Sequence, residues 1–581
     1  MSLRILKASA GSGKTYSLTE TYIRFCLDPK YGLDFTHILA ITFTNKASAE
    51  MKDRIIGLLY TLSRSPSDYP GISNLKDDLQ LSLEEIQIRS GLILNRILKE
   101  FNQFSITTID SFFTRLYGSM TLDLFGDVPG EVTTDVEKAL EYAADQLIAE
   151  CQEDKALKEI LLDILDENIR KGLGVGLKRS LTRLGMELFN DEFLRLRTKS
   201  NYIEPIKDLH QAISHKVDLF ELEFENYRNE LKHLLKSGGL DHKDFFRGFT
   251  KSILDKESMD DLIKLKSFER IADQDKWFTT KEQDLMMVKV SPIADELLEL
   301  GKRFFDYVKQ HAQQYSTYTI VLRNYGAFRV LRFLYQSMQD YLKTHRLNLL
   351  SEINFKINQH LTMEDSMVIY EKIGQRIRAV MIDEFQDTSQ IQWDNLVPLI
   401  QNNMAEGFPN LVVGDVKQAI YRFRNGRWEI MEIQVPEFKK PWLAPGENLF
   451  DHLEYNWRSS PEIVHFNNNF FTGVAADVSF RLRDYISGYT MDSQSGITPD
   501  QINELVKLAN AAELVYKNAS QRVPEKNLDK NGFVDLTCHF YPRKPDKSEL
   551  ERLRFSWLKE KLIDLFEDGF EGENIGILAR G

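Results

Sequence analysis

Apolar and polar positions along the chain predict strands and helices in turn. Short apolar runs that are each followed by a segment of helical periodicity are typical of buried strands in a parallel sheet. The run that ends near Ile109 leads into a helix that we expect to be capped by Asp110 or Ser111. We therefore predict an α/β domain built from residues 1–120 and 376–445. The runs that predict its strands are 3–6, 37–43, 104–109, 379–382 and 410–413.

The segment between these two halves has a different pattern. From about residue 122 to residue 375, long amphipathic stretches with a helical period follow one another. We predict an inserted helical domain over residues 121–375. A loop with Pro441, Pro445 and Gly446 then indicates a boundary, and residues 446–581 should form a further domain. Its predicted strands are 532–541 and 573–581, and a surface insertion is expected over 485–530.

Composition limits the classes of protein that fit. A chain of 581 residues is too long for one core and should form about three or four domains. No apolar stretch approaches a membrane span and no secretory leader precedes the first strand, so we expect a cytoplasmic protein with no membrane partner. Three widely spaced cysteines exclude a zinc ribbon or iron–sulfur cluster built from them alone. Because the net charge is −13, nucleic-acid binding would need a local groove.

A phosphate-binding loop follows the first strand directly. Gly11 and Gly13 allow a tight turn whose backbone N–H groups face phosphate oxygens, and Lys14 can reach the β- and γ-phosphates. Thr15 offers a hydroxyl to Mg²⁺ at the start of a helix whose positive end faces the same phosphates. The alternative is a strand-to-helix turn that binds nothing, and the flanking strand and amphipathic helix disfavour it. The loop residues are Ala8, Ser9, Ala10, Gly11, Ser12, Gly13, Lys14 and Thr15.

Two adjacent carboxylates, Asp383 and Glu384, end the strand at 379–382. Such a pair is costly to hold together unless a cation is present, and a magnesium-bound nucleotide supplies one. We expect Asp383 to hold Mg²⁺ through water and Glu384 to orient and deprotonate the attacking water. Gln418, after the next strand, is placed to sense a γ-phosphate. The alternative is two acids at the start of an ordinary helix, which the phosphate loop in the same sheet disfavours.

The loop after the second strand has the composition of a polyanion contact. Phe43 can stack on a base, while Thr44 and Asn45 can donate hydrogen bonds to phosphate. Parallel α/β sheets place ligands at this end of their strands. The same residues would also suit a solvated turn with a helix N-cap, so the loop by itself leaves both interpretations open.

Aromatic and cationic side chains also follow the strand at 410–413. Tyr421, Phe423 and Arg424 interleave rings with charge, as a stacking platform for single-stranded bases does. The alternative is a helix that buries Ile420 and Phe423 in the core, and for Phe423 alone the two interpretations are equal.

A last pair of candidate residues lies in 453–460. Arg458, delivered from a second domain, is placed to neutralise charge that develops on a γ-phosphate. The adjacent Trp457 is placed to stack on adenine.

Taken in their order along the chain, the motifs described above resemble those of the superfamily 1 DNA helicases of the UvrD/Rep type, and most closely those of the RecB/AddA-like branch. The resemblance implies a RecA-like P-loop NTPase domain (1–120 and 376–445), a helical insertion and the beginning of a second RecA-like domain (446–581). It implies an ATP- and Mg²⁺-dependent helicase or translocase that moves 3′ to 5′ on single-stranded DNA in double-strand-break repair. The implied partners are DNA and a second helicase–nuclease subunit. The matching blocks are ASAGSGKT, ITFTNKASAEMKDRI, TIDSF, IDEFQDT, VVGDVKQAIYRFR and YNWRSS.

The resemblance also implies roles for single residues. Gln418 would couple the nucleotide state to DNA, Arg458 would be an arginine finger and Trp457 would lie beside adenine. The implied MgATP-binding and hydrolysis residues are Lys14, Thr15, Asp383 and Glu384. The implied DNA contacts are Phe43, Thr44, Asn45, Thr108, Tyr421, Phe423 and Arg424.

Some features depart from the family pattern. Tyr16 stands where the UvrD-like branch often has Arg, and Asp110 replaces the usual His of the TIDSF block. Motifs V and VI, and the nuclease common in this branch, would follow Gly581, so we expect residues 1–581 alone to bind nucleotide weakly and hydrolyse it poorly. An ATP-gated nucleic-acid-binding scaffold that does not unwind is an alternative, and RNA as the track stays open. The intact set of hydrolysis residues favours the motor.

Overall fold

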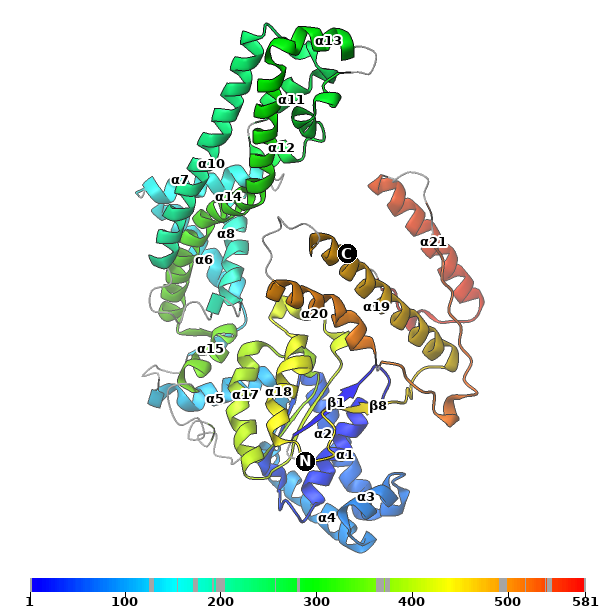
Figure 1. The fold of residues 1–581 in the computed structure, drawn as a ribbon. Helices are drawn as coiled ribbons and strands as arrows, with labels where there is room; N and C mark the ends of the chain where they lie inside the picture. The colour runs from blue at the N-terminus through cyan, green and yellow to red at the C-terminus, as the bar shows by residue number, and fades with distance from the viewer. Residues whose placement is uncertain are drawn as a thin grey trace.

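The computed structural model shows a sheet-containing body from which a long helical arm rises (Figure 1). The helices that follow residue 460 lie beside this body. The structure describes residues 3–578 except 125–129, 154, 171–175, 191–192, 195–203, 257, 279–282, 362–369, 371–376, 491–498, 518, 539 and 541–545.

Six parallel strands form the central sheet in the order β3-β2-β6-β7-β1-β8. The predicted parallel α/β sheet is confirmed, with strands at all five predicted positions. The edge strand β8 was not predicted because it is only three residues long and begins with two polar residues. The strands are β1 (Leu3–Ala8), β2 (Ile38–Thr42), β3 (Ile106–Thr108), β6 (Ala379–Ile382), β7 (Asn410–Gly414) and β8 (Asp451–Leu453).

Alternate side chains of each strand feed two hydrophobic layers. In β1, Leu3 and Ile5 join the layer on one face of the sheet, and Leu6 and Ala8 join the other. Because both faces are buried, the strands read as nearly continuous apolar runs. The first layer includes α5 (Ile109–Leu124), α15 (Leu350–Leu361) and α17 (Gln390–Ala405), and the second includes α1 (Lys14–Leu27), α2 (Asn45–Arg64), α3 (Ile72–Leu79) and α4 (Leu83–Lys99).

Two boundaries of the sheet domain differ from the predicted ones. The apolar side of α15 packs through Ile353 and Ile357 into the same layer as Phe112 of α5, although residues 121–375 were expected to form the insertion. Likewise, β8 pairs with β1, although it follows the predicted boundary at residue 446. The sheet domain therefore takes in α15 and ends after Leu453.

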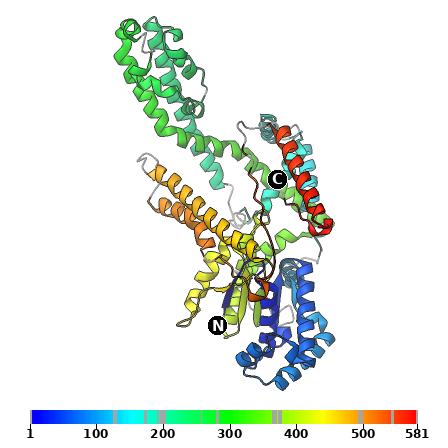
Figure 2. The same ribbon diagram turned by 90° about the vertical axis from the view of Figure 1, so that its right-hand side faces the viewer.

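The insertion is helical, as predicted, and extends away from the sheet in both views (Figures 1 and 2). Its longest helix, α14, has 52 residues and contributes to two separate apolar clusters. A two-stranded parallel sheet of β4 (Glu131–Thr133) and β5 (Leu347–Leu349) joins the two chain crossings at its base. The helices are α6 (Val136–Glu150), α7 (Lys155–Arg170), α8 (Leu177–Gly185), α10 (Glu204–Ser237), α11 (Phe249–Leu254), α12 (Met259–Ile263), α13 (Gln283–Val290) and α14 (Ala294–His345).

After β8 the described chain is helical or irregular. Helices α19 (Pro461–Thr490) and α20 (Pro499–Tyr516) pack together, and α21 (Lys547–Glu567) stands apart from them in both views. The strands predicted at 532–541 and 573–581 are wrong, since no described residue of either segment is in a strand. An apolar run becomes a strand only when a neighbouring strand pairs with it, and neither segment has one among the described residues. Among the described helices, none is both long and apolar enough to cross a bilayer.

Candidate functional site

The predicted site residues meet where the parallel strands end. Lys7 at the end of β1 lies opposite Gly414 at the end of β7, and Ile382 of β6 lies opposite Ile41 of β2. The loops that follow these four strands therefore leave the same edge of the sheet. This register gathers the phosphate loop, the acid pair and both aromatic segments.

The phosphate loop has the backbone that its glycines predict. Gly11 and Gly13 have φ of 75° and 86°, a region that other residues rarely adopt. The Ser12 N–H donates to the carbonyl of Ser9 at 3.1 Å, and α1 begins directly afterwards at Lys14. The Ser12 hydroxyl is buried and has no hydrogen-bond partner in the described structure, so it is available to a bound group.

Lys14 and the acid pair face each other across the sheet edge. The Lys14 ammonium lies 2.7 Å from Oε2 of Glu384, whose backbone is held at φ 50°. Burial, followed by the nearby Glu384 charge, raises the pKa of Asp383 to about 6, although Lys14 opposes the shift. These are the surroundings of a carboxylate that needs a cation, so they fit a magnesium-bound nucleotide.

The predicted metal ligands are close to this pair but do not form a cage. Thr15 lies in the first turn of α1, partly exposed, and its carbonyl accepts a hydrogen bond from the Thr19 hydroxyl. The described residues contain no cluster of three or more His, Cys, Asp or Glu side chains able to hold a metal. A Mg²⁺ ion shared by Thr15 and Asp383 would thus take its remaining ligands from phosphate and water, as Mg²⁺ usually does.

The segment with Trp457 and Arg458 lies directly on the phosphate loop. The backbone N–H of Trp457 donates to the carbonyl of Gly11 at 2.8 Å. The indole ring of Trp457 is half exposed and lies beside Gly13. Arg458 is exposed and lies close to the loop. A methyl group added to Gly11 would be only 3.1 Å from the Cβ of Arg458. The segment that carries Arg458 follows β8 and is hydrogen-bonded to the loop, and the origin of this arginine in a second domain stays a prediction.

Two residues that the sequence did not single out fix this segment. Asn456 accepts hydrogen bonds through Oδ1 from the backbone N–H groups of Arg458 and Ser459, at 3.0 and 2.9 Å. Its amide nitrogen donates to Gln521, and the amides of both residues donate to the carbonyl of Ala10. Asn456 lies inside a recognisable block, whereas no local signal marks Gln521.

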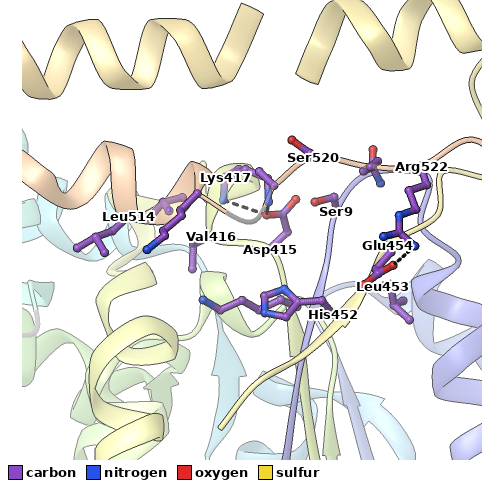
Figure 3. A pocket seen from close by; sticks show the side chains of 15 residues that line it. Ser9, Asp415, Val416, Lys417, His452, Leu453, Glu454, Leu514, Ser520 and Arg522 are labelled. Carbon is purple, nitrogen blue, oxygen red and sulfur yellow. Dashed lines mark hydrogen bonds and ion pairs between the residues drawn. The ribbon is translucent and has the colours of Figure 1, made fainter. Parts of the chain in front are cut away.

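A polar pocket of about 390 Å³ opens beside the loop, between the ends of β1, β7 and β8 and residues 514–522 (Figure 3). Ser9 and Arg522, which lie far apart in the sequence, both line it. Arg522 pairs with Glu454 at 3.0 Å, and backbone bonds join Arg522 to Glu454 and Asn456. These contacts hold residues 519–522, which form one wall of the pocket, against the segment after β8.

Gln418 lies at the end of β7 but is engaged elsewhere. Its amide nitrogen donates to Oδ2 of Asp415 at 2.6 Å, and Lys417 pairs with the other oxygen at the same distance. Gln418 therefore lies at the predicted edge of the sheet. The buried Asp415 holds its side chain, and no contact with Lys14 or Glu384 is seen in the described structure.

The aromatic residues form one linked series, in which Phe43 and Tyr421 are half-buried and Phe423 is exposed. The rings of Phe43 and Tyr421 have centroids 4.5 Å apart, and those of Tyr421 and Phe423 are 5.8 Å apart. The guanidinium of Arg424 lies over both later rings, at 5.6 and 5.8 Å. Phe423 is 78% exposed and Ile420 is 70% exposed, so the alternative of a helix that buries them is wrong. A linked set of rings that ends in an exposed ring and carries a cation suits stacked bases.

The polar residues expected to contact DNA are placed differently. The Thr44 hydroxyl caps α2 through the N–H of Ala47, which is the N-cap alternative, and Asn45 is exposed beside it. The Thr108 hydroxyl is buried and accepts from the N–H of Ser111. Thr108 therefore caps α5, and the expected caps Asp110 and Ser111 are wrong, because the helix begins at Ile109.

Asp110, in the first turn of α5, is half-buried. Burial raises its pKa, while Arg424 and the amides of Gln392 and Asn354 lower it. The carboxylate thus faces a cation of the aromatic series.

The sequence matches a known family over most of its length. The UvrD/REP helicase N-terminal domain matches residues 2–439. A relative from Clostridium botulinum (strain Alaska E43 / Type E3), named as an ATP-dependent helicase/nuclease subunit, is 22% identical over 515 residues, covering 81% of this chain. The exonuclease/helicase subunit RexA of Streptococcus pneumoniae serotype 4 is 25% identical over 489 residues, covering 80%. The chain spans 38% of the length of each relative.

Proposed function

The chain belongs to the UvrD/REP helicase family, and from this premise we propose that it is an ATP-dependent DNA motor that moves 3′ to 5′ on a single strand. The family, and the RecB/AddA-like branch of helicase–nuclease proteins that the order of motifs indicated, are confirmed. The motor is proposed to act in double-strand-break repair, as part of a helicase–nuclease.

Nucleotide binding is assigned to the phosphate loop and its neighbours. The backbone N–H groups of 11–13 and the Lys14 ammonium bind phosphate, and the buried Ser12 hydroxyl is free to donate to it. Thr15 and Asp383 would hold a Mg²⁺ ion, which would supply positive charge to neutralise the phosphates.

Hydrolysis is assigned to residues around that terminal phosphate. The Glu384 carboxylate, released from Lys14 when phosphate takes the ammonium, accepts a proton from water. Arg458 supplies positive charge from above the loop, and Trp457 offers an exposed ring to the base.

The DNA track is assigned to the aromatic series, and this series is the observation that carries the proposal. Phe43, Tyr421 and Phe423 come from loops after two different strands, yet their rings adjoin. A hydrolysis site alone has no use for three linked rings at the same sheet edge, of which Phe423 is exposed and the other two are half-buried. Stacking on such rings tolerates every base, as a translocating motor requires. Asn45 and Arg424 are placed for phosphate, whereas Thr44 and Thr108 act first as helix caps.

The remaining chain is assigned by its position. We place the first RecA-like domain on the six-stranded sheet, the insertion on the helical arm, and the beginning of the second RecA-like domain on the residues after β8. Both relatives are named as single subunits of such an enzyme, so a second helicase–nuclease subunit is the proposed protein partner.

The test measures ATP hydrolysis by the full-length protein with and without single-stranded DNA. A parallel measurement replaces the DNA with RNA of the same length. We expect DNA to stimulate hydrolysis, and Lys14→Ala and Glu384→Gln to lower the rate by two orders of magnitude or more, about the effect expected for loss of a catalytic group. Glu84→Gln, an exposed residue in the first turn of α4, is a control that should leave the rate unchanged.

Strand displacement separates unwinding from translocation. A duplex with a 3′ single-stranded tail should be opened faster than one with a 5′ tail. If DNA gives no stimulation and Glu384→Gln changes nothing, the motor proposal fails. If RNA stimulates and DNA does not, the track has been assigned wrongly.

A further inference from the structure

Gln386 is a buried amide that touches both halves of the proposed motor site. Its side chain is 1% exposed, and its amide nitrogen donates to Oε2 of Glu384 at 2.7 Å. Its amide oxygen accepts from the backbone N–H of Asp415 at 2.9 Å. One side chain therefore links the carboxylate assigned to hydrolysis with the segment that follows β7.

The fit around this amide is close. A methyl group added to Gly414 would come within 2.6 Å of the Gln386 amide oxygen and 2.8 Å of the sulfur of Met431. Only a residue without a Cβ lets the end of β7 approach so near. The amide cannot rotate away without losing a hydrogen bond that burial makes costly to lose.

On the nucleotide side, Gln386 shares Glu384 with Lys14. Both the Lys14 ammonium and the Gln386 amide contact the same oxygen, Oε2, each at 2.7 Å. When a phosphate takes Lys14, the Gln386 amide is the side chain of the described structure that still positions this carboxylate. The orientation of Glu384 then depends on where Gln386 is held, and Asp415 holds it.

On the DNA side, the segment from Asp415 leads within six residues to the aromatic series. Asp415 binds Lys417 and Gln418 through its carboxylate, and the ring of Tyr421 then packs against that of Phe43. Backbone contacts join the same two segments further on, because the N–H of Arg427 donates to the carbonyl of Thr388 at 3.0 Å. A shift of Tyr421 on binding DNA therefore has a short, packed route to Gln386.

We propose that Gln386 is a positioning residue that couples DNA stacking at Tyr421 to the orientation of Glu384. The inference rests on the proposed motor function and adds to it the physical link between the two ligand sites. In thermodynamic terms, each ligand changes the affinity of the other through this amide, and the coupling is reciprocal.

The test compares the affinity of a labelled oligodeoxythymidylate for the full-length protein with and without Mg²⁺ and a non-hydrolysable ATP analogue. In the natural protein we expect the analogue to change DNA affinity at least about fivefold. Gln386→Met has nearly the same volume but no hydrogen bonds, and should bring that ratio to within about twofold of 1. Each ligand measured alone should still bind within about threefold of the natural affinity.

Gln390→Met is the matched control. Gln390 is also buried, at 7% exposed, but its amide bonds to Asp394 and Gln434 rather than to either site. It should keep the full coupling. Gln386→Asn is the second variant, in case the methionine does not fold. Its amide is one methylene shorter, so it cannot reach Glu384 and Asp415 together, and coupling should fall as for methionine.

Coupling that persists in both Gln386 variants, or is lost equally in Gln390→Met, overturns the inference but not the motor. A natural protein that binds both ligands without coupling overturns it as well. If the natural protein binds neither ligand, the proposed function fails, and the inference fails with it.

Discussion

The ionised form of Asp383 is energetically unfavourable in the folded protein without nucleotide. Burial and the Glu384 charge raise its pKa from 3.8 to about 6. Asp383→Asn keeps an oxygen for the hydrogen bond from the N–H of Glu384 and leaves the pair of Lys14 with Glu384 in place. The substitution therefore removes the unfavourable charge and little else.

The sign and size follow from linkage. A folded pKa above the unfolded one means that the native state binds more protons between pH 4 and 6, so the free energy of unfolding falls as pH rises through that window. The difference from 3.8 to about 6 corresponds to at most about 3 kcal/mol at pH 7.5 and to less than about 1 kcal/mol at pH 4. Asp383→Asn should be the more stable protein by these amounts.

The assay is urea denaturation at pH 4, 5 and 7.5 without nucleotide or Mg²⁺, with Asp53→Asn as the control. Asp53 is exposed on α2, so its substitution should change the free energy of unfolding by no more than about 0.5 kcal/mol. Mg²⁺ with nucleotide should then stabilise the natural protein but not Asp383→Asn. A variant that is less stable at pH 7.5, or whose gain is the same at pH 4, would show that this carboxylate is not strained.

Three further substitutions test the site from other sides. Phe423→Ala should leave stability within about 0.5 kcal/mol, because the ring is 78% exposed, but should weaken single-stranded DNA binding by about 1–3 kcal/mol, measured by fluorescence anisotropy. Gly11→Ala places a methyl 2.6 Å from Oδ1 of Asn456 at φ 75°, so calorimetry should show nucleotide affinity lowered at least tenfold, about 1.4 kcal/mol. Asn456→Ala leaves two backbone N–H groups without their acceptor and should cost about 1–3 kcal/mol in thermal unfolding. Unchanged DNA binding, nucleotide affinity or stability, respectively, would contradict each.

Local sequence predicts what depends on local chemistry. The strands around Ile5 and Met381 are apolar on both faces, and the glycines of the phosphate loop set its turn, so these features could be placed from the sequence. The acid pair could be found for the same reason, since two carboxylates at a strand end demand a cation.

What could not be predicted depends on partners far along the chain. Gln521 holds the carbonyl of Ala10 across 511 positions, and no pattern near either residue marks the contact. The edge strand β8 is too short and polar to be recognised without β1 beside it. The exposure of Phe423 was equally ambiguous, because the spacing of a stacking series and that of a buried helical face are similar over four residues.

The same distinction explains why Gln386 escaped notice although it lies only two residues after Glu384 in the chain. A glutamine among carboxylates in IDEFQDT has no distinctive chemistry of its own. Its importance comes from Gly414, which has no Cβ and so lets β7 bring the N–H of Asp415 within 2.9 Å. The Gln386 amide is then fixed between the Glu384 carboxylate, which is proposed to accept a proton, and the backbone of Asp415, which leads to Tyr421 and Phe423. In such a motor the groups that do chemistry can be found from residue type, whereas the groups that transmit motion are found only from what they touch.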